Sequence, residues 1–352
     1  MTKQASHEVL ADDYIFRLTD DTGILQHGKF GIPDPRHGYT TDDNARALIM
    51  ALLLRERFGK KEYLDLVYRY ASFILNAQNS NGAFKNVMSY DRKWLDEEGS
   101  EDCFGRCLWA LGYGVSSAAA PQEVKNCFRY LLQKALPRVK SLNSPRAKAY
   151  SIIGLTHLEG DETKELVSQI ARSLCDQYEE YKDDGWNWFE NIVTYSNHIL
   201  PWSLFTAFRL TKERGFLNVA EESLAFLSKL TLTKRYFKPI GCHGWLIKGA
   251  SPADFDEQPI EACEAALTYL TAFEITGDKQ YLQKARQCHA WYDGSNSKGI
   301  RLLDRAGGGC YDGLTEDGVN HNMGAESLIS YWISYLTIVK FMGLSNNSSG
   351  AC

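Results

Sequence analysis

Six carboxylates stand close to the starts of segments with helical hydrophobic periodicity, and their types and places suit them for catalysis. They are Asp42, Asp43, Asp102, Glu190, Glu261 and Glu326. Hydrolysis of a glycosidic bond needs one carboxyl group that stays protonated and a second that is ionised, so a pair from this set could carry that reaction. An acidic residue in the first turn of a helix is also a common partner of the helix dipole, which gives each of the six a structural explanation.

Asp42 and Asp43 are adjacent, which makes them different from the other four. One of two neighbouring side chains can cap a helix while the other points into the protein. We expect Asp43 and Glu190 to be the acid and the base, with their order left open. Asp42 is a further candidate for a catalytic carboxylate. Asp102, Glu261 and Glu326 are the alternates.

Aromatic, histidine and arginine side chains accompany these carboxylates in the same parts of the chain. Sugars are bound by aromatic rings that stack on their apolar faces and by charged or polar groups that take their hydroxyls. The tryptophans and histidines have equally ordinary places in a protein core. The candidates for sugar binding are Arg36, His37, Tyr39, Arg106, Trp186, Trp188, His198, His243, Trp245 and His321.

A repeated pattern of helical segments positions these residues. Six polar, carboxylate-bearing or small-residue starts run into apolar helical segments, and a more charged helical segment usually follows each of them. The starts lie 60, 43, 51, 63 and 64 residues apart, which is the spacing of helix pairs. The sequence therefore predicts an all-α fold, an (α/α)6 toroid. The six inner segments are 41–58, 101–117, 144–158, 195–211, 258–277 and 322–341.

The connections between helices differ in length on the two sides of the predicted ring. Links after the inner segments are short, with a glycine placed as a helix C-cap at Gly59, Gly160 and Gly277. Connections before them are long at 79–100, 181–194, 232–257 and 293–321, and long loops in compact domains are usually functional. Parallel inner helices would put these loops on one rim, where we expect the site. The segment 7–18 is expected to close the outer ring.

Composition narrows the class of protein. The 352 residues carry a net charge of −5 with scattered Lys and Arg, which argues against a nucleic-acid partner. The start of the sequence has no apolar leader and no stretch is long enough to span a membrane, so we expect a cytoplasmic protein. The nine cysteines and the histidines show no spaced ligand set, so we expect neither metal nor cofactor. We expect one domain over 1–352 with a disordered tail at 344–352; two domains are the alternative, and the oligomeric state stays open.

Three runs resemble a known group of proteins. They are RLTDDTGILQHGKFGIPDPRHGYTTDDNARAL, GWNWFENIVTYSNHILPWSLFTAF and NHNMGAES. They are similar to bacterial (α/α)6-toroid proteins found near or fused to glycosyltransferases and mannoside phosphorylases, and more broadly to six-hairpin glycosidases. The resemblance covers nearly the whole chain and implies carbohydrate chemistry. It brings no catalytic residues to carry over.

The leading hypothesis is an inverting glycoside hydrolase that acts on a short oligosaccharide, with mannose as one candidate sugar. A wide cavity suits the larger carboxyl separation of inverting enzymes. A sugar 2-epimerase that uses His198 and His321 for proton transfer is the first alternative. A non-catalytic sugar-binding module is the second.

Overall fold

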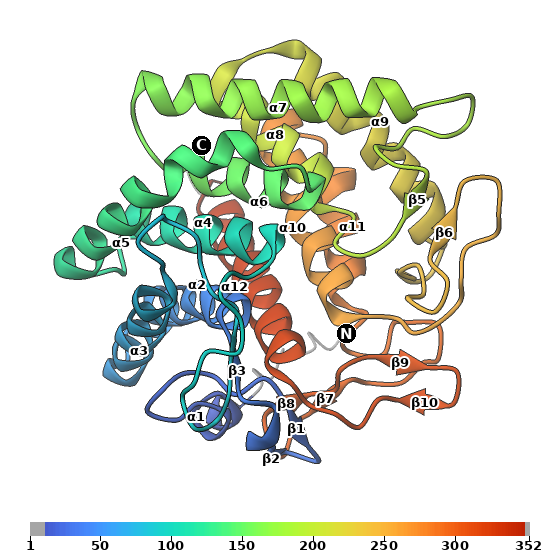
Figure 1. Ribbon diagram of the computed structural model, residues 1–352. Coiled ribbons are helices and arrows are strands. Elements are labelled where there is room, and N and C mark those ends of the chain that lie inside the picture. Colours follow the sequence, from blue (N-terminus) through green and yellow to red (C-terminus); the bar gives the residue numbers. More distant parts are fainter. Residues whose placement is uncertain (1–10, 349–352) are drawn as a thin grey trace.

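Six helices form a closed ring in the computed structural model, which describes residues 11–348 (Figure 1). Each of them packs against the next, and the last packs against the first. This arrangement confirms the predicted all-α toroid. The inner helices are α2 (Thr41–Phe58), α4 (Glu101–Ser116), α6 (Pro145–Leu155), α8 (Ile199–Thr211), α10 (Pro259–Thr276) and α12 (Ala325–Ser348).

An outer helix follows each inner helix except the last and packs against it. Each of these helices buries one face; α3, for example, buries Tyr63, Leu66 and Tyr70 and exposes its charged residues. Figure 1 shows α3, α5, α7 and α9 at the periphery. The outer helices are α3 (Lys61–Ala77), α5 (Gln122–Ala135), α7 (Asp161–Tyr181), α9 (Arg214–Thr231) and α11 (Lys279–His289).

The two ends of the described chain differ from the sequence-based expectation. Of the segment 7–18, residues 7–10 lie outside the described residues, and α1 (Asp13–Leu18) is a short helix. The Tyr14 hydroxyl donates to the Met323 carbonyl at 2.8 Å, which ties α1 to the start of α12. Helix α12 continues to Ser348, and residues 349–352 of the tail expected at 344–352 lie outside the described residues. No helix within residues 11–348 is long and apolar enough to cross a membrane.

Side-chain caps set where the inner helices begin. The Thr40 hydroxyl accepts from the Asp43 amide at 3.3 Å, so Thr40 is the N-cap of α2 and Thr41 is its first residue. Ser100 and Ser144 cap α4 and α6 in the same way. Gly59 and Gly277 end α2 and α10 in left-handed conformation, as their positions predicted.

Short strand pairs join the long loops to one another. Strand β3 (Tyr39–Thr40) pairs with β4 (Val87–Met88), which joins the loops before α2 and α4. Strand β5 (Ile192–Val193) pairs with β6 (Leu246–Ile247), which joins the loops before α8 and α10. The strands gather on one side of the molecule in Figure 1. The other strands form hairpins: β1 (Gly28–Lys29) with β2 (Ile32–Pro33), β7 (Leu303–Asp304) with β8 (Gly309–Cys310), and β9 (Leu314–Thr315) with β10 (Gly318–Val319).

Isolated bridges join further loops on the same side of the ring, and we call these connected long loops the collar of loops. The bridge between Glu257 and Leu314 links the loops before α10 and α12, and the bridge between Lys29 and Asn322 links those before α2 and α12. Two 3-10 helices, Pro35–His37 and Leu136–Ser141, lie in the connections. The long loops therefore share one rim, as the sequence predicted.

Glycines allow α4 and α6 to approach closely. A Cβ atom on Gly112 would lie 2.0 Å from the Gly154 carbonyl oxygen, and one on Gly154 would lie 2.3 Å from the Leu108 carbonyl oxygen. Backbone atoms cannot move aside as flexible side chains can, so a larger residue at either position must push the two helices apart.

Gly112→Ala is expected to lower the free energy of unfolding by about 1–3 kcal/mol, because it overpacks this contact. Gly215→Ala in α9 is the matched control, since a Cβ there meets nothing within 4 Å. Its free energy of unfolding should stay equal or rise by up to about 1 kcal/mol, the usual gain of alanine in a helix. Urea unfolding measures both, and equal stability of the two variants would contradict the close α4–α6 contact.

Candidate active site at the rim of the helix ring

A polar cavity of about 440 Å³ lies where the starts of α2, α10 and α12 meet. Three of the six predicted carboxylates line it: Asp42, Asp43 and Glu326. Amides and hydroxyls supply much of the remaining wall. The lining residues are Gln26, His27, Thr40, Asp42, Asp43, Arg46, Asn86, Val87, Gln258, Pro259, Asp312, Asn320, Asn322, Gly324, Glu326 and Ser327.

Arg46 holds the three carboxylates together. Its Nη2 lies 2.8 Å from Asp43 Oδ1 and its Nη1 lies 3.0 Å from Glu326 Oε2. Nη2 is also 3.6 Å from Asp42 Oδ1. The Arg46 side chain is 4% exposed, and a guanidinium so deeply buried is stable only among carboxylates that compensate its charge. Helices α2 and α12 are therefore joined by charge at the cavity wall.

The charged network continues from Asp42 to the other side of the ring. Arg106 on α4 places Nη1 2.7 Å from Asp42 Oδ2, and its guanidinium lies 5.2 Å from the centre of the Tyr150 ring. The Tyr150 hydroxyl on α6 donates to Glu264 Oε1 on α10 at 2.5 Å. Four of the six inner helices contribute to this buried chain, which fixes the starts of the helices relative to one another.

The environment of the cavity separates the two adjacent aspartates in acidity. Burial opposes ionisation of Asp42, yet the charges of Arg106 and Arg46 hold its pKa below the usual value. Burial and the neighbouring Asp42 charge raise the pKa of Asp43 to about 7. The Thr40 hydroxyl, which donates to Asp43 Oδ2 at 2.5 Å, keeps that carboxyl in place. Near neutral pH one aspartate is thus ionised while the other holds a proton for part of the time.

The other three predicted carboxylates make structural contacts outside this cavity lining. Asp102 accepts hydrogen bonds from Ser144 Oγ and from the Tyr195 hydroxyl, both at 2.6 Å. Glu190 forms an ion pair with Arg146 Nη1 at 2.8 Å. Glu190 is therefore not among the residues that line the cavity with Asp43.

Glu261 has a structural partner set of its own. Its carboxylate accepts from the backbone amides of Ser196 and Asn197 and from the Asn197 side chain. These contacts hold 195–198 in a non-helical path, which explains why α8 begins at Ile199 and not at residue 195. Burial raises the pKa of Glu261 to about 7.

Four of the predicted sugar-binding residues are buried. Trp186 and Trp188 pack on Phe226, and their indole nitrogens donate to backbone carbonyls. Tyr39 is buried and donates to Asp20. His198 is buried beside Phe237 and Tyr269. Each of these four side chains therefore packs against aromatic rings or bonds protein groups, and none of them lines the cavity.

The predicted pair of His198 and His321 is not formed. Both ring nitrogens of His198 lack a hydrogen-bond partner, and burial lowers its pKa to about 3. His321 is exposed and contacts Phe30 and Tyr311 instead. The two histidines therefore have separate environments.

The remaining predicted binding residues lie around the cavity and not in its wall. Arg36 is exposed and pairs with Asp34, and His37 contacts the ring of His27 edge-on at 4.6 Å. Trp245 packs near Tyr195, and His243 is exposed beside Asp256. Arg106 belongs to the buried charge network described above.

Two residues of the cavity wall, Asp312 and Asn322, were not among the candidates. Asp312 accepts from Ser327 Oγ at 2.5 Å and from the Gly324 amide at 2.7 Å, and burial raises its pKa. The Asn322 amide bonds His27 Nδ1 at 2.7 Å. Asp312 lies in a loop without periodicity, so no local pattern marked it.

Glu264 was also missed. It is 2% exposed, and its Oε2 has no hydrogen-bond partner. Burial and the charge of Glu261 raise its pKa to about 8. The signal in the sequence was a glutamate inside an apolar stretch of α10, since burial of a carboxyl group costs free energy unless a partner compensates it.

The sequence matches no family model and no curated protein, but the fold has solved relatives. A sugar epimerase from a ruminal bacterium aligns with a TM-score of 0.72 at 14% identity, over 93% of this chain and 96% of that one. Cellobiose 2-epimerase from Bacillus thermoamylovorans B4167 aligns with a TM-score of 0.71 at 11% identity, over 93% of this chain and 96% of that one. The GH76 α-mannanase from Bacteroides thetaiotaomicron aligns with a TM-score of 0.61 at 11% identity, over 88% of each chain.

These likenesses, together with the closed ring, define the class of the fold: an all-α toroid of the kind found in sugar epimerases and six-hairpin glycosidases. The solved structures that it resembles are enzymes acting on carbohydrates. At these identities the likeness establishes the architecture alone. The chemistry must be argued from the cavity.

The raised pKa values of Asp43, Glu261 and Glu264 predict a stability that changes with pH. A carboxyl with a folded-state pKa above its unfolded value binds more protons when folded, so the contribution of these three groups to stability is fully present below about pH 4 and is lost as the pH rises to about 8. Glu264→Gln removes one such group. We expect the loss of free energy of unfolding between pH 5 and pH 8 to shrink by about 1 kcal/mol or more, as one pKa unit corresponds to about 1.4 kcal/mol.

Urea unfolding at pH 5 and pH 8 measures this difference. Glu316→Gln, which changes an exposed carboxylate, is the control and should leave the pH dependence of the parent protein unchanged. An identical pH dependence in the Glu264→Gln variant and the parent would show that Glu264 is not protonated in the folded protein.

Proposed function

We propose that the protein is a glycoside hydrolase in which Asp43 donates a proton to the leaving oxygen and Glu326 activates water. The observation that carries the proposal is the position of Asp43 and Glu326 on the two terminal nitrogens of one buried guanidinium, in the wall of one cavity. A carboxyl with a pKa of about 7 is suited to general acid catalysis near neutral pH. Glu326 is 39% exposed and therefore accessible to water from the cavity.

In the proposal, Asp42 adjusts the pKa of the proton donor Asp43. Its negative charge is among the causes that raise the pKa of Asp43, while Arg106 and Arg46 keep Asp42 itself ionised. Such divergent acidities of neighbouring carboxyls are typical of acid and base groups in glycosidases. Asp42 acts through Asp43 in this scheme and positions Arg46.

An inverting reaction is the stereochemical part of the proposal. A base that activates water stands farther from the acid, at a carboxyl separation of roughly 6.5–9.5 Å, than a base that attacks carbon directly. Asp43 and Glu326 bond different terminal nitrogens of Arg46 and not each other, which is compatible with a separated acid and base.

The cavity supports a short oligosaccharide as the substrate. Its volume of about 440 Å³ lies in the range of small-ligand sites, and its amides and hydroxyls can bond sugar hydroxyls. Mannose is one candidate sugar. The proteins that the run ending in DDNARAL resembles occur near mannoside phosphorylases, and a D-mannose isomerase and an α-mannanase share the fold.

A sugar 2-epimerase is the second candidate, and the fold likeness to two sugar epimerases favours it. His27 lines the cavity and touches His37. Rings in edge contact lie on the same side of the cavity and leave no room for a sugar between them. An epimerase would then have to work with His27 as its single histidine base. If the protein neither cleaves nor isomerises an oligosaccharide, it is a sugar-binding module without catalysis.

Asp43→Asn and Glu326→Gln are each expected to lower turnover of an oligosaccharide by roughly 10²–10⁴-fold, the usual contribution of positioned proton transfer. Glu190→Gln is the control, as its carboxylate pairs with Arg146 outside the cavity lining, and turnover should stay within a few-fold of the parent. Chromatography on manno-, gluco- and galacto-oligosaccharides, with and without phosphate, measures cleavage, and NMR of the first product reports its anomer. Formation of an isomer without cleavage would replace the hydrolase with the epimerase.

Asp42→Asn should move the alkaline limb of the pH–rate profile to lower pH by about one unit. Removing the Asp42 charge lowers the pKa of Asp43, so the protonated, active form is lost earlier as the pH rises. The profile of kcat/KM against pH measures this shift. An alkaline limb at the parental pH would mean that Asp43 is not the proton donor.

A further inference from the structure

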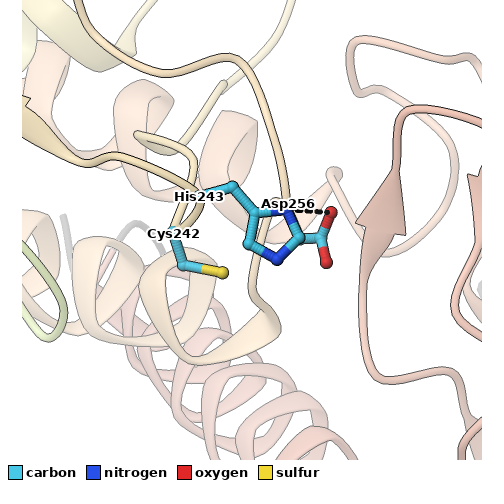
Figure 2. Close-up of side chains that lie close together, drawn as sticks. All are labelled: Cys242, His243 and Asp256. Carbon is cyan, nitrogen blue, oxygen red and sulfur yellow. Dashed lines mark ion pairs between the residues drawn. The ribbon is translucent and has the colours of Figure 1, made fainter.

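Cys242, His243 and Asp256 converge in the long loop that precedes α10. One possible ligand atom from each lies within 4.8 Å of the others, and His243 Nδ1 is 3.6 Å from Asp256 Oδ1. Figure 2 shows the thiol, the imidazole and the carboxylate side by side. The sequence analysis found no metal-ligand set, because Asp256 is distant in sequence from the Cys–His pair and only the folded loop brings them together.

The backbone beneath these side chains is held in place. The Cys242 amide donates to the Asp256 carbonyl and the His243 amide donates to the Phe255 carbonyl, both at 3.0 Å. A Cβ on Gly241 would lie 2.3 Å from the Phe255 backbone, so only glycine permits this close approach. The two stretches are thus fixed as a pair, and binding of an ion would not have to order them first.

The ligand types and distances indicate which ion fits. A thiolate, an imidazole nitrogen and a carboxylate oxygen together favour zinc over the hard ions calcium and magnesium. In a tetrahedral zinc site with metal–ligand bonds of about 2.0–2.2 Å, nitrogen and oxygen ligands stand roughly 3.3–3.5 Å apart. The His243–Asp256 distance of 3.6 Å is close to this value.

We propose that Cys242, His243 and Asp256 bind a zinc ion and leave a fourth position for water. His243 is 74% exposed, so the ion reaches the group directly from solvent. Asp256 precedes Gln258, which lines the candidate cavity, so the ion would fasten the loop 232–257 at the cavity entrance. The site uses none of the proposed catalytic carboxylates and stands independently of the proposed function.

Titration with Co²⁺ tests the proposal, with tag-free, reduced protein that has been stripped of metal by a chelator. We expect one equivalent of Co²⁺ to bind, with a sulfur-to-cobalt charge-transfer band in the near ultraviolet and visible bands of a tetrahedral ion. Zn²⁺ should displace the cobalt and raise the melting temperature of the protein, as any ligand of the folded state does. Absence of binding to the parent protein at millimolar Co²⁺ would overturn the proposal.

Variants locate the ion. Cys242→Ser should abolish the charge-transfer band, and His243→Ala and Asp256→Ala should each weaken Co²⁺ binding at least tenfold. Cys127→Ser, on the distant helix α5, is the matched control and should behave as the parent. Circular dichroism confirms that each variant is folded. A charge-transfer band that persists in Cys242→Ser, or that is lost in Cys127→Ser, would refute the assignment.

Discussion

The buried guanidinium of Arg46 is the interaction on which the cavity depends. It bonds Asp43 on its own helix and Glu326 on α12, and thereby closes the ring between the first and the last inner helix. Removing either partner of a buried ion pair such as Arg46–Asp43 typically costs about 3–5 kcal/mol, because the remaining charge is left uncompensated. The same charge also holds the Asp43 and Glu326 carboxylates in the cavity wall. Stability and chemistry therefore rest on one side chain.

The collar of loops decides where a site can form. Pairing of β3 with β4 and of β5 with β6 ties neighbouring loops together, and the bridges at Glu257 and Asn322 extend the collar to α12. The cavity opens where the loops before α2, α10 and α12 meet. On the other side of the rim, Arg146, Tyr195 and Asp102 fill the space with their own hydrogen bonds and ring contact. That packing explains why Glu190 and Asp102 are separate from Asp43.

The toroid supports several reactions, so the identities of the cavity residues must carry any functional argument. The solved structures of this shape include epimerases, an isomerase and glycosidases. In this chain the described cavity wall presents carboxylates and an arginine, with His27 as its one histidine. A wall of that composition is better suited to protonating an oxygen than to removing a proton from carbon with opposed bases.

The sequence by itself determined the helices and their order, since hydrophobic periodicity and glycine or hydroxyl caps act over a few residues. It also placed Asp42, Asp43 and Glu326 at helix starts, where a common rim follows from parallel inner helices. Only the tertiary structure decided that Trp188 and His198 are core residues and that Glu190 pairs with Arg146, because burial depends on what the neighbouring helices present. Asp312 and the Cys242, His243 and Asp256 group were equally hidden from the sequence, since long loops have no period that reveals which residues meet.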